Sequence, residues 1–284
     1  METKFHIRFS DLHIGFCADF PMAVASELRP FVISEGDSRE NYRVRVLTEP
    51  MEPEGEELYS SRELRVFAKG KDRTFLFHAR RDEQGLIPAC KISSTGEHEL
   101  WVSPRMAETL SEDHRLTGLL CIEQLLLLRR GLLLHSSVVF HEGKVILFSG
   151  PCGMGKSTQA RLWEETLGAS TLNGDRCVLT VEQGIVKGGG SPWCGSSGIY
   201  DPSWGPVEAI VLLRQGKENR MDLAPPTVAF RELYRQCLVH PWDSEFVNET
   251  CNIITDILST IPVYTLSCLP DPSAVHLCYE KIFG

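Results

Sequence analysis

Residues 150–157 read GPCGMGKS, which fits the pattern G-x-x-x-x-G-K-[ST] of a phosphate-binding loop. Such a loop holds polyphosphate mainly through backbone N–H groups, which converge on the oxygens only where missing Cβ atoms let the chain curl tightly. Lys156 would place its charge between the β- and γ-phosphates, and Ser157 would offer its hydroxyl to Mg²⁺. The pattern therefore predicts a site for the phosphates of a nucleotide.

The segments on either side of this loop favour the same prediction. Residues 145–148 form a continuous apolar run typical of a buried strand, and residues 157–167 carry apolar side chains at helical spacing before Gly168. The helix would point the positive end of its dipole at the anion. The residues expected around the phosphates are Gly150, Pro151, Cys152, Gly153, Met154, Gly155, Lys156, Ser157 and Thr158.

A lone acidic side chain follows the expected helix. Asp175 lies in the polar stretch 173–176 between two apolar segments, so we expect it at a strand junction, beside the phosphates if the sheet has the usual arrangement. A carboxylate there can bind Mg²⁺ or accept a proton from an attacking hydroxyl. The same residues also suit a tight hairpin turn. The sequence leaves both interpretations open.

Two further features have a functional and a structural interpretation each. His135 ends an apolar run, and a lone histidine in such a run is more often a hydrogen-bonded core residue than a catalytic one. Residues 188–198 are rich in glycine and serine. They predict either a mobile lid over phosphate or peptide, or a simple flexible connection.

Composition narrows the class of protein and its partners. The 284 residues include 42% hydrophobic and 24% charged residues, which is typical of a globular chain, and the net charge of -9 argues against a broad nucleic-acid surface. The most apolar run, residues 116–128, is too short to span a bilayer. We therefore expect neither nucleic acid nor a membrane as a partner.

The ten cysteines are scattered and form no C-x-x-C pair. This usage predicts reduced thiols in a cytoplasmic protein rather than disulfides or a zinc site. Cys152, inside the loop and near a helix N-terminus, is either a reactive thiol or a small filler at a permissive position.

The chain divides by pattern into two parts. Residues 1–110 contain short alternating segments, among them 42–46, 64–67 and 74–78, which predict a mostly antiparallel, β-rich N-terminal domain of unknown role. A helix over 111–128, capped within Ser111–Asp113, would open the second domain, residues 111–284.

The second part has an α/β pattern. Strands are expected at 138–140, 145–148, 177–180, 207–213 and 262–266, and helices at 157–167, 228–238, 246–258 and 271–282. Asp243 or Ser244 would cap the helix over 246–258, and Asp271 would cap the last helix, with Pro272 at its first position.

Three features of the chain resemble the kinase domain of bacterial HPr serine kinase/phosphorylase and its relatives, which share a nucleotide fold with ATP-dependent phosphoenolpyruvate carboxykinase. His135 lies fifteen residues before Gly150, the loop matches, and residues 174–176 fall where that family has an Asp-Asp motif. The resemblance covers roughly residues 112–284. It implies an α/β fold class, with a P-loop kinase domain of the HPr kinase and phosphoenolpyruvate carboxykinase type preceded by a mostly β N-terminal domain.

The resemblance also implies an activity and a set of roles. ATP and Mg²⁺ would be the cofactors, and a hydroxyl, most simply a serine of a peptide or small protein, would be phosphorylated. His135, Lys156 and Asp175 would be catalytic, while Ser157 and Asp175 would bind Mg²⁺. Because relatives in the family assemble into oligomers, a homo-oligomer is also expected.

The chain departs from the family at the Asp-Asp motif, where one acid is missing. Gly174 stands in its place or, after a one-residue slip, Arg176 does. If the absent acid is the base, Asp175 must serve both purposes or transfer is impaired. Two alternatives therefore stay open: a non-catalytic nucleotide-binding regulator, and a small-molecule kinase with a fold like phosphoenolpyruvate carboxykinase.

Overall fold

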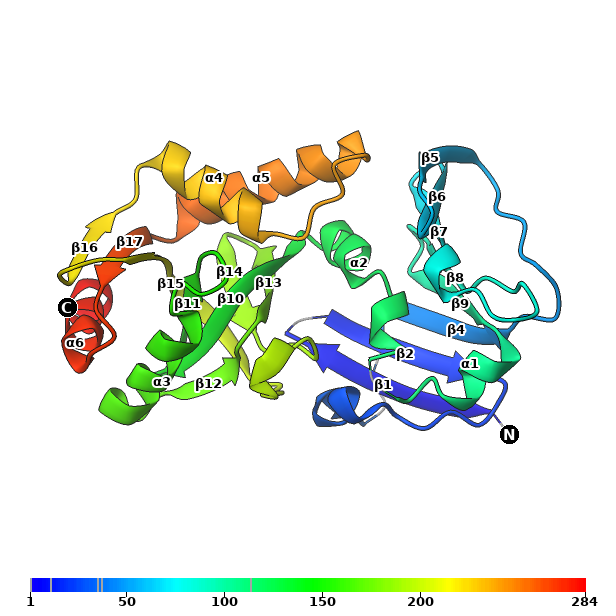
Figure 1. The fold of residues 1–284 in the computed structure, drawn as a ribbon, viewed down its shortest axis with the longest axis horizontal. Coiled ribbons are helices and arrows are strands. Elements are labelled where there is room, and N and C mark those ends of the chain that lie inside the picture. Colours follow the sequence, from blue (N-terminus) through cyan, green and yellow to red (C-terminus); the bar gives the residue numbers. More distant parts are fainter. Residues whose placement is uncertain (1, 11, 35, 37, 113) are drawn as a thin grey trace. The chain divides into compact units, whose positions relative to one another are not determined.

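The computed structural model describes residues 2–10, 12–34, 36, 38–112 and 114–284. The protein is a mixed α/β chain with two sheets (Figure 1). It divides into an N-terminal unit, Met1–Arg8 with Leu12–Leu128, and a C-terminal unit, Phe9–Asp11 with Arg129–Gly284. This division falls later in the chain than the domain boundary near residue 110 that the sequence suggested.

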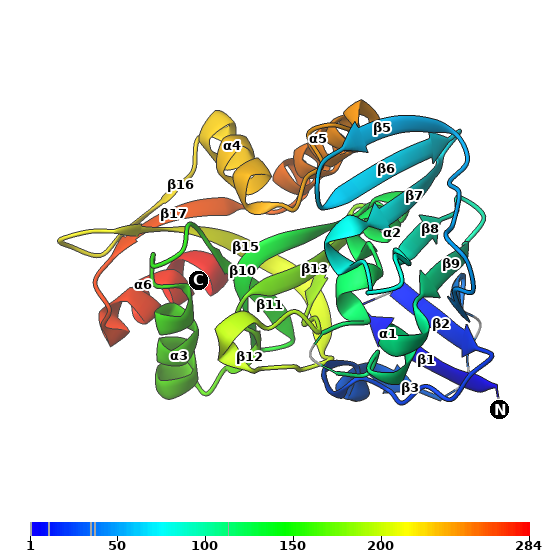
Figure 2. The same ribbon diagram turned by 45° about the vertical axis from the view of Figure 1, so that its right-hand side comes forward.

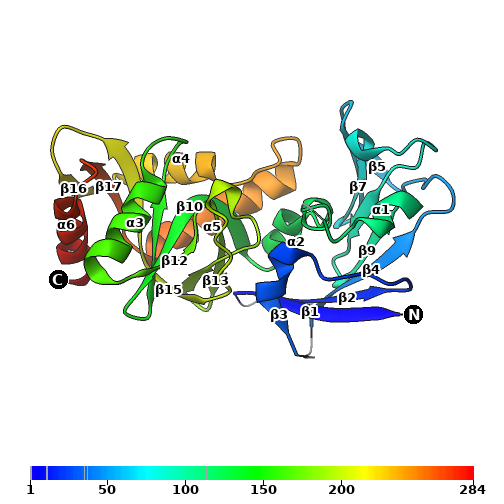
Figure 3. The ribbon, with the colours of Figure 1, turned by 60° about the horizontal axis from the view of Figure 1, so that its bottom comes forward.

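The N-terminal unit is built on nine described strands in the order β3-β1-β2-β4-β9-β8-β7-β6-β5 (Figure 3). The antiparallel pairs include β5–β6, β6–β7, β7–β8 and β8–β9, as the alternating segments predict. However, β4 is parallel to both β2 and β9. The strands are β1 Thr3–Phe9, β2 Leu12–Ala18, β3 Val32–Ile33, β4 Glu40–Val46, β5 Glu56–Ser60, β6 Leu64–Lys69, β7 Asp72–Phe77, β8 Ala89–Ile92 and β9 Glu97–Val102.

The prediction of a single helix over residues 111–128 is wrong. Among the described residues of this unit the helices are α1 Pro104–Glu108 and α2 Ile122–Leu128, with the 3-10 turns η1 Ser26–Phe31, η2 His78–Arg80 and η3 Thr117–Leu119. Cys121 has a left-handed φ of 47°. The hydroxyl of Tyr42 donates to the Leu120 carbonyl at 2.5 Å, so that carbonyl bonds to the sheet instead of continuing a helix. Asp113, part of the expected cap, lies outside the described residues.

The C-terminal unit contains the segments that the sequence associates with chemistry. Its strands are β10 Gly131–His141, β11 Lys144–Ser149, β12 Ser170–Asn173, β13 Arg176–Glu182, β14 Ile185–Gly189, β15 Trp204–Gln215, β16 Arg220–Leu223 and β17 Val263–Cys268. Its helices are α3 Lys156–Leu167, α4 Pro226–Gln236, α5 Ser244–Thr260 and α6 Pro272–Phe283, with the 3-10 turn η4 Gly195–Ser197.

Strand pairing in this unit runs around a closed ring. Neighbouring strands pair in the order β11-β10-β13-β14-β15, and β15 returns to pair in parallel with β11. Beyond the ring, β15 pairs in parallel with β17, and β17 pairs with β16. As a result, β11 lies between β10 on one side and β15 on the other.

The helices cover this sheet on two sides. Helices α3 and α6 pack against each other (Figure 2). They bury Trp163, Val275 and Cys278 against strand residues such as Phe148 and Val211. Helices α4 and α5 lie on the other side of the strands (Figure 1). No helix among the described residues is both long and apolar enough to cross a bilayer.

The expected ends of several elements are observed. Gly168 takes a left-handed conformation, φ 66°, at the end of α3. The Asp243 side chain accepts hydrogen bonds from the backbone N–H groups of Glu245 and Phe246 at the start of α5, and Asp271 caps α6 in the same way. Local capping chemistry therefore decides where these helices begin and end.

Candidate functional site

The loop between β11 and α3 has the backbone conformation that its glycines permit. Gly150, Gly153 and Gly155 have φ values of 150°, 80° and 97°, a region that favours glycine because it has no Cβ. Gly155 is also the residue from which α3 begins. The glycine positions in the motif therefore correspond to real backbone requirements.

Lys156 closes this loop from inside. Its ammonium donates to the carbonyl oxygens of Gly150 at 2.9 Å and Pro151 at 3.1 Å, and the residue is only 8% exposed. Burial lowers the pKa of this ammonium. Ser157 and Cys152, by contrast, are exposed. The loop thus combines an inward cation with a hydroxyl and a thiol on its surface.

Strand register brings His135 to this loop. Ser136 pairs with Ser149, the last residue of β11, and the Ser149 hydroxyl donates to the His135 carbonyl at 2.9 Å. On its other edge β10 pairs with β13, and there His135 lies opposite Arg176. The end of β11, the middle of β10 and the start of β13 are therefore neighbours.

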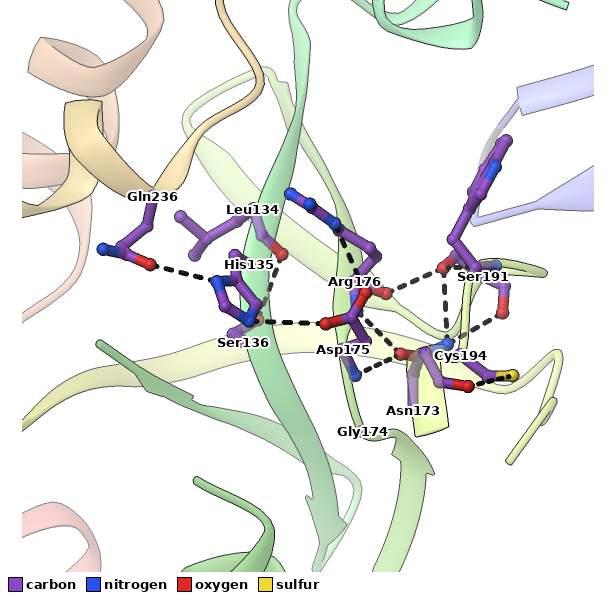
Figure 4. A network of polar contacts seen from close by, with 12 residues as sticks. Leu134, His135, Ser136, Asn173, Gly174, Asp175, Arg176, Ser191, Cys194 and Gln236 are labelled. Carbon is purple, nitrogen blue, oxygen red and sulfur yellow. Dashed lines mark hydrogen bonds and ion pairs between the residues drawn. The ribbon is translucent and has the colours of Figure 1, made fainter. Parts of the chain in front are cut away.

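His135 contacts Asp175 and Gln236 (Figure 4). Its Nε2 lies 3.3 Å from Oδ1 of Asp175, and its Nδ1 lies 3.2 Å from Oε1 of Gln236, the last residue of α4. Burial, and then the positive charge of Lys156, lower the pKa of His135, and the Asp175 carboxylate opposes them. The imidazole is therefore neutral at physiological pH, with one N–H to share between two facing oxygens.

Asp175 lies at a break within an extended run. Strands β12 and β13 both pair antiparallel with β10, one after the other, so residues 174–175 are not the tip of a hairpin. The backbone of the break is bonded to β10. The Ser136 N–H donates to the Asp175 carbonyl at 3.0 Å, and the Ser137 hydroxyl donates to the Gly174 carbonyl at 3.3 Å.

Asn173 fixes the conformation of this break. Its Oδ1 accepts the backbone N–H groups of Asp175 at 2.7 Å and Arg176 at 2.8 Å. Its Nδ2 donates to the carbonyl of Ser191 at 2.8 Å, and the Ser191 hydroxyl donates onward to the Arg176 carbonyl (Figure 4). Asn173 and Ser191 are fully buried. The glycine-rich segment 188–198 is therefore tied to the site rather than free of it.

The glycine-rich segment also leaves little space beside Asp175. A Cβ on Gly174 would lie 2.5 Å from Cβ of Ser197, and a Cβ on Gly195 would lie 2.9 Å from Cβ of Asp175. Contacts this short do not occur without movement of the neighbouring chain. With Ser197 in this place, position 174 does not accommodate a second carboxylate, and Asp175 is the acidic side chain of the break.

The arrangement unites all three predicted catalytic residues in one region. Lys156 and Asp175 both act electrostatically on His135, and Asp175 acts on Lys156. Two residues that bond to Asp175 and His135, namely Asn173 and Gln236, were not predicted as part of the site. The asparagine was visible as part of a turn-like stretch, whereas Gln236 lies 101 residues from His135 and no local pattern points to it.

The oxygen atoms of Asp175 and Ser157 fit one type of Mg²⁺ site. Among the described residues no group of three or more His, Cys, Asp and Glu could hold a metal ion. Mg²⁺ in nucleotide sites is bound by one or two protein oxygens together with phosphates and water. The half-exposed Asp175 carboxylate and the exposed Ser157 hydroxyl fit that type of site.

Comparisons with known proteins find a likeness among solved structures only. No protein-family model matches the chain, and no curated protein matches it. Among solved structures, the Hpr(Ser) kinase/phosphatase from Coxiella burnetii matches with 12% identity and a TM-score of 0.30, over 54% of this chain and 99% of that one.

Proposed function

We propose that the protein is an ATP-dependent, Mg²⁺-requiring phosphotransferase that phosphorylates a hydroxyl. One observation supports the proposal: the glycine loop, whose carbonyls bind Lys156, lies next to the strand that carries His135, and His135 contacts Asp175. A loop of this kind fits the phosphates of a nucleotide, and the pair fits the place where a proton must be removed. A serine on a peptide or small protein is the acceptor that the family resemblance suggests.

The proposed transfer is a direct, in-line displacement. The acceptor oxygen forms a bond to the γ-phosphorus as the bond from that phosphorus to the β,γ-bridging oxygen breaks, and ADP leaves. The hydroxyl proton passes to the Asp175 carboxylate, which the neutral His135 orients from 3.3 Å. Lys156 balances the negative charge of the transferring group. Mg²⁺, when bound at Ser157 and Asp175, would neutralise further phosphate charge.

Transfer of labelled γ-phosphate from ATP tests the proposal. Peptide fractions of a cell extract are the acceptors, and water is the slow alternative acceptor. We expect Asp175→Asn to reduce transfer by about 10²-fold or more, since general base catalysis contributes that much. The matched control is Asp222→Asn, at an exposed position of strand β16. The proposal fails if the folded protein transfers label neither to any peptide nor to water.

One observation favours a second function, a nucleotide-binding regulator without turnover. The family's second acid is missing, and Ser197 fills the space that a side chain at position 174 would need. A regulator would bind nucleotide and lose that affinity on Lys156→Ala, yet would give no product before or after the change. An enzyme would lose product formation itself.

A further inference from the structure

A cavity of about 370 Å³ adjoins the glycine loop on the side away from His135. Gly153, Thr158 and Gln159 line it from the loop and the first turn of α3, while Gln215 and Cys268 line it from the ends of β15 and β17. Gln215 is tied to the loop, because its Nε2 donates to the Gly153 carbonyl at 3.3 Å. This cavity and the loop are therefore one continuous surface.

Strand order explains why the cavity and the His–Asp pair lie on different sides of the loop. β11 is parallel to β15, β15 is parallel to β17, and the cavity lies beyond the carboxyl ends of these strands. Ligands of α/β sheets bind outside such ends. β10, which carries His135, pairs with the opposite edge of β11. A nucleotide with its phosphates on the loop would extend into the cavity and keep its γ-phosphate near His135.

The part of the cavity lining that lies outside the glycine loop suits a neutral ring. None of the described residues that line it carries a charged side chain, and Met154, Leu269 and Pro270 supply apolar surface. Burial raises the pKa of the Cys268 thiol, so this group is also uncharged at neutral pH.

Gln159, one of the lining residues, has a side-chain oxygen without a partner among the described residues. The residue is 2% exposed, and its Nε2 donates to Sγ of Cys268 at 3.4 Å. Its Oε1 is buried and has no hydrogen-bond partner among the described residues. An unpartnered buried acceptor is costly unless a ligand satisfies it.

We propose that this cavity holds the base of the nucleotide and that Gln159 Oε1 accepts a hydrogen bond from the exocyclic amino group of an adenine. The inference rests on the proposed function, because it assumes that the loop binds the phosphates of the same molecule. It predicts that the protein binds a purine with an amino group at C6 more tightly than a purine with oxygen at C6.

Binding of three ligands by calorimetry tests this assignment. ATP, ITP and inorganic tripolyphosphate share the phosphate chain, and ITP differs from ATP in having oxygen in place of the amino group. We expect the protein to bind ATP roughly tenfold more tightly than ITP, the size of one well-placed hydrogen bond. Gln159→Leu should bring the two affinities together and leave tripolyphosphate binding unchanged.

The matched control is Gln124→Leu. Gln124 is a buried glutamine of α2 in the N-terminal unit. Like Gln159, it has one amide atom without a partner among the described residues, in this case Nε2. The variant should keep the preference for ATP. Equal affinity of the unaltered protein for ATP and ITP, or an equal loss of ATP and tripolyphosphate binding in Gln159→Leu, would overturn the base assignment. Absence of binding by all three ligands would instead remove the proposed function.

A second measurement covers the case in which Gln159→Leu does not fold. Alkylation of Cys268 by iodoacetamide is followed by mass spectrometry in the unaltered protein, with the partly exposed Cys251 of α5 as the internal control. ATP should slow alkylation of Cys268 several-fold more than tripolyphosphate does and leave Cys251 unaffected. Equal protection by the two ligands would contradict the inference.

Discussion

The Asn173 side chain positions the Asp175 carboxylate, because it accepts hydrogen bonds from the backbone around Asp175. One amide oxygen accepts two successive N–H groups, and the amide nitrogen binds Ser191. These hydrogen bonds stabilise the irregular backbone of residues 174–175, between β12 and β13. At this scale, the side chain that bears the chemistry is positioned by a neutral neighbour two residues away.

Asn173→Ala should be strongly destabilising. It leaves the N–H groups of Asp175 and Arg176 without their acceptor, and we expect a loss of about 2–4 kcal/mol in the free energy of unfolding. Urea unfolding measures the change. Ser170→Ala, an exposed position on β12, is the control and should stay within about 0.5 kcal/mol. A comparable small effect for both variants would contradict this account of Asn173.

Gly174→Ala tests whether the missing acid has been excluded by packing. We expect a loss of about 1–3 kcal/mol, because the new Cβ would lie 2.5 Å from Cβ of Ser197. The double variant Gly174→Ala/Ser197→Gly should be more stable than the sum of the two single changes, since the second removes the atom that clashes. Additive free energies of unfolding would show that Ser197 does not restrict this position.

At the scale of elements, β10 organises the site. It is one strand of eleven residues that pairs with β11, β12 and β13. The sequence predicted only residues 138–140 as strand, because the apolar run before His135 has no alternation to distinguish a buried strand from other buried structure. The break at Asp175 was predicted as a strand junction, and its pairing with β10 removes the hairpin interpretation.

Helix boundaries show which sequence signals are sufficient. Asp243, Asp271 and Gly168 act through contacts within a few residues, so the ends of α5, α6 and α3 could be predicted closely. The expected helix over 111–128 failed because Tyr42, far away in the chain, takes the Leu120 carbonyl. Local patterns do not contain a hydrogen bond between residues 78 positions apart.

The cap of α5 gives a prediction at this scale. Asp243→Ala should lower the free energy of unfolding by about 1–2 kcal/mol, because two backbone N–H groups lose their acceptor. Asp256→Ala, near the end of the same helix, removes an exposed ion pair with Arg130 and should cost less than about 1 kcal/mol. The prediction is refuted if the two variants unfold at the same urea concentration.

At the scale of the whole molecule, the free cysteines provide a pH dependence. Burial raises the pKa of Cys177 and Cys278 from 9.0 to about 12. Above pH 9 the unfolded chain loses these two thiol protons while the folded protein retains them, so ionisation favours the unfolded state. The stability due to neutral buried thiols is full below pH 9 and is lost as the pH rises toward 12.

Alkaline unfolding measures this effect. Between pH 9 and 12 each thiol should reduce the free energy of unfolding by about 1 kcal/mol per pH unit. Cys278→Ala should make the decline less steep, whereas Cys251→Ala, at a partly exposed position of α5, should not. An unchanged slope in Cys278→Ala would exclude this thiol as a cause.

The central claim is that the glycine loop, closed by Lys156, binds the phosphates of a nucleotide. Calorimetric titration with Mg·ATP tests it most directly, with Lys156→Ala as the variant and Lys144→Ala, an exposed lysine at the start of β11, as the control. We predict binding by the unaltered protein and by Lys144→Ala, and at least tenfold weaker binding by Lys156→Ala. No heat of binding from folded, unaltered protein, or unchanged affinity in Lys156→Ala, would contradict the claim.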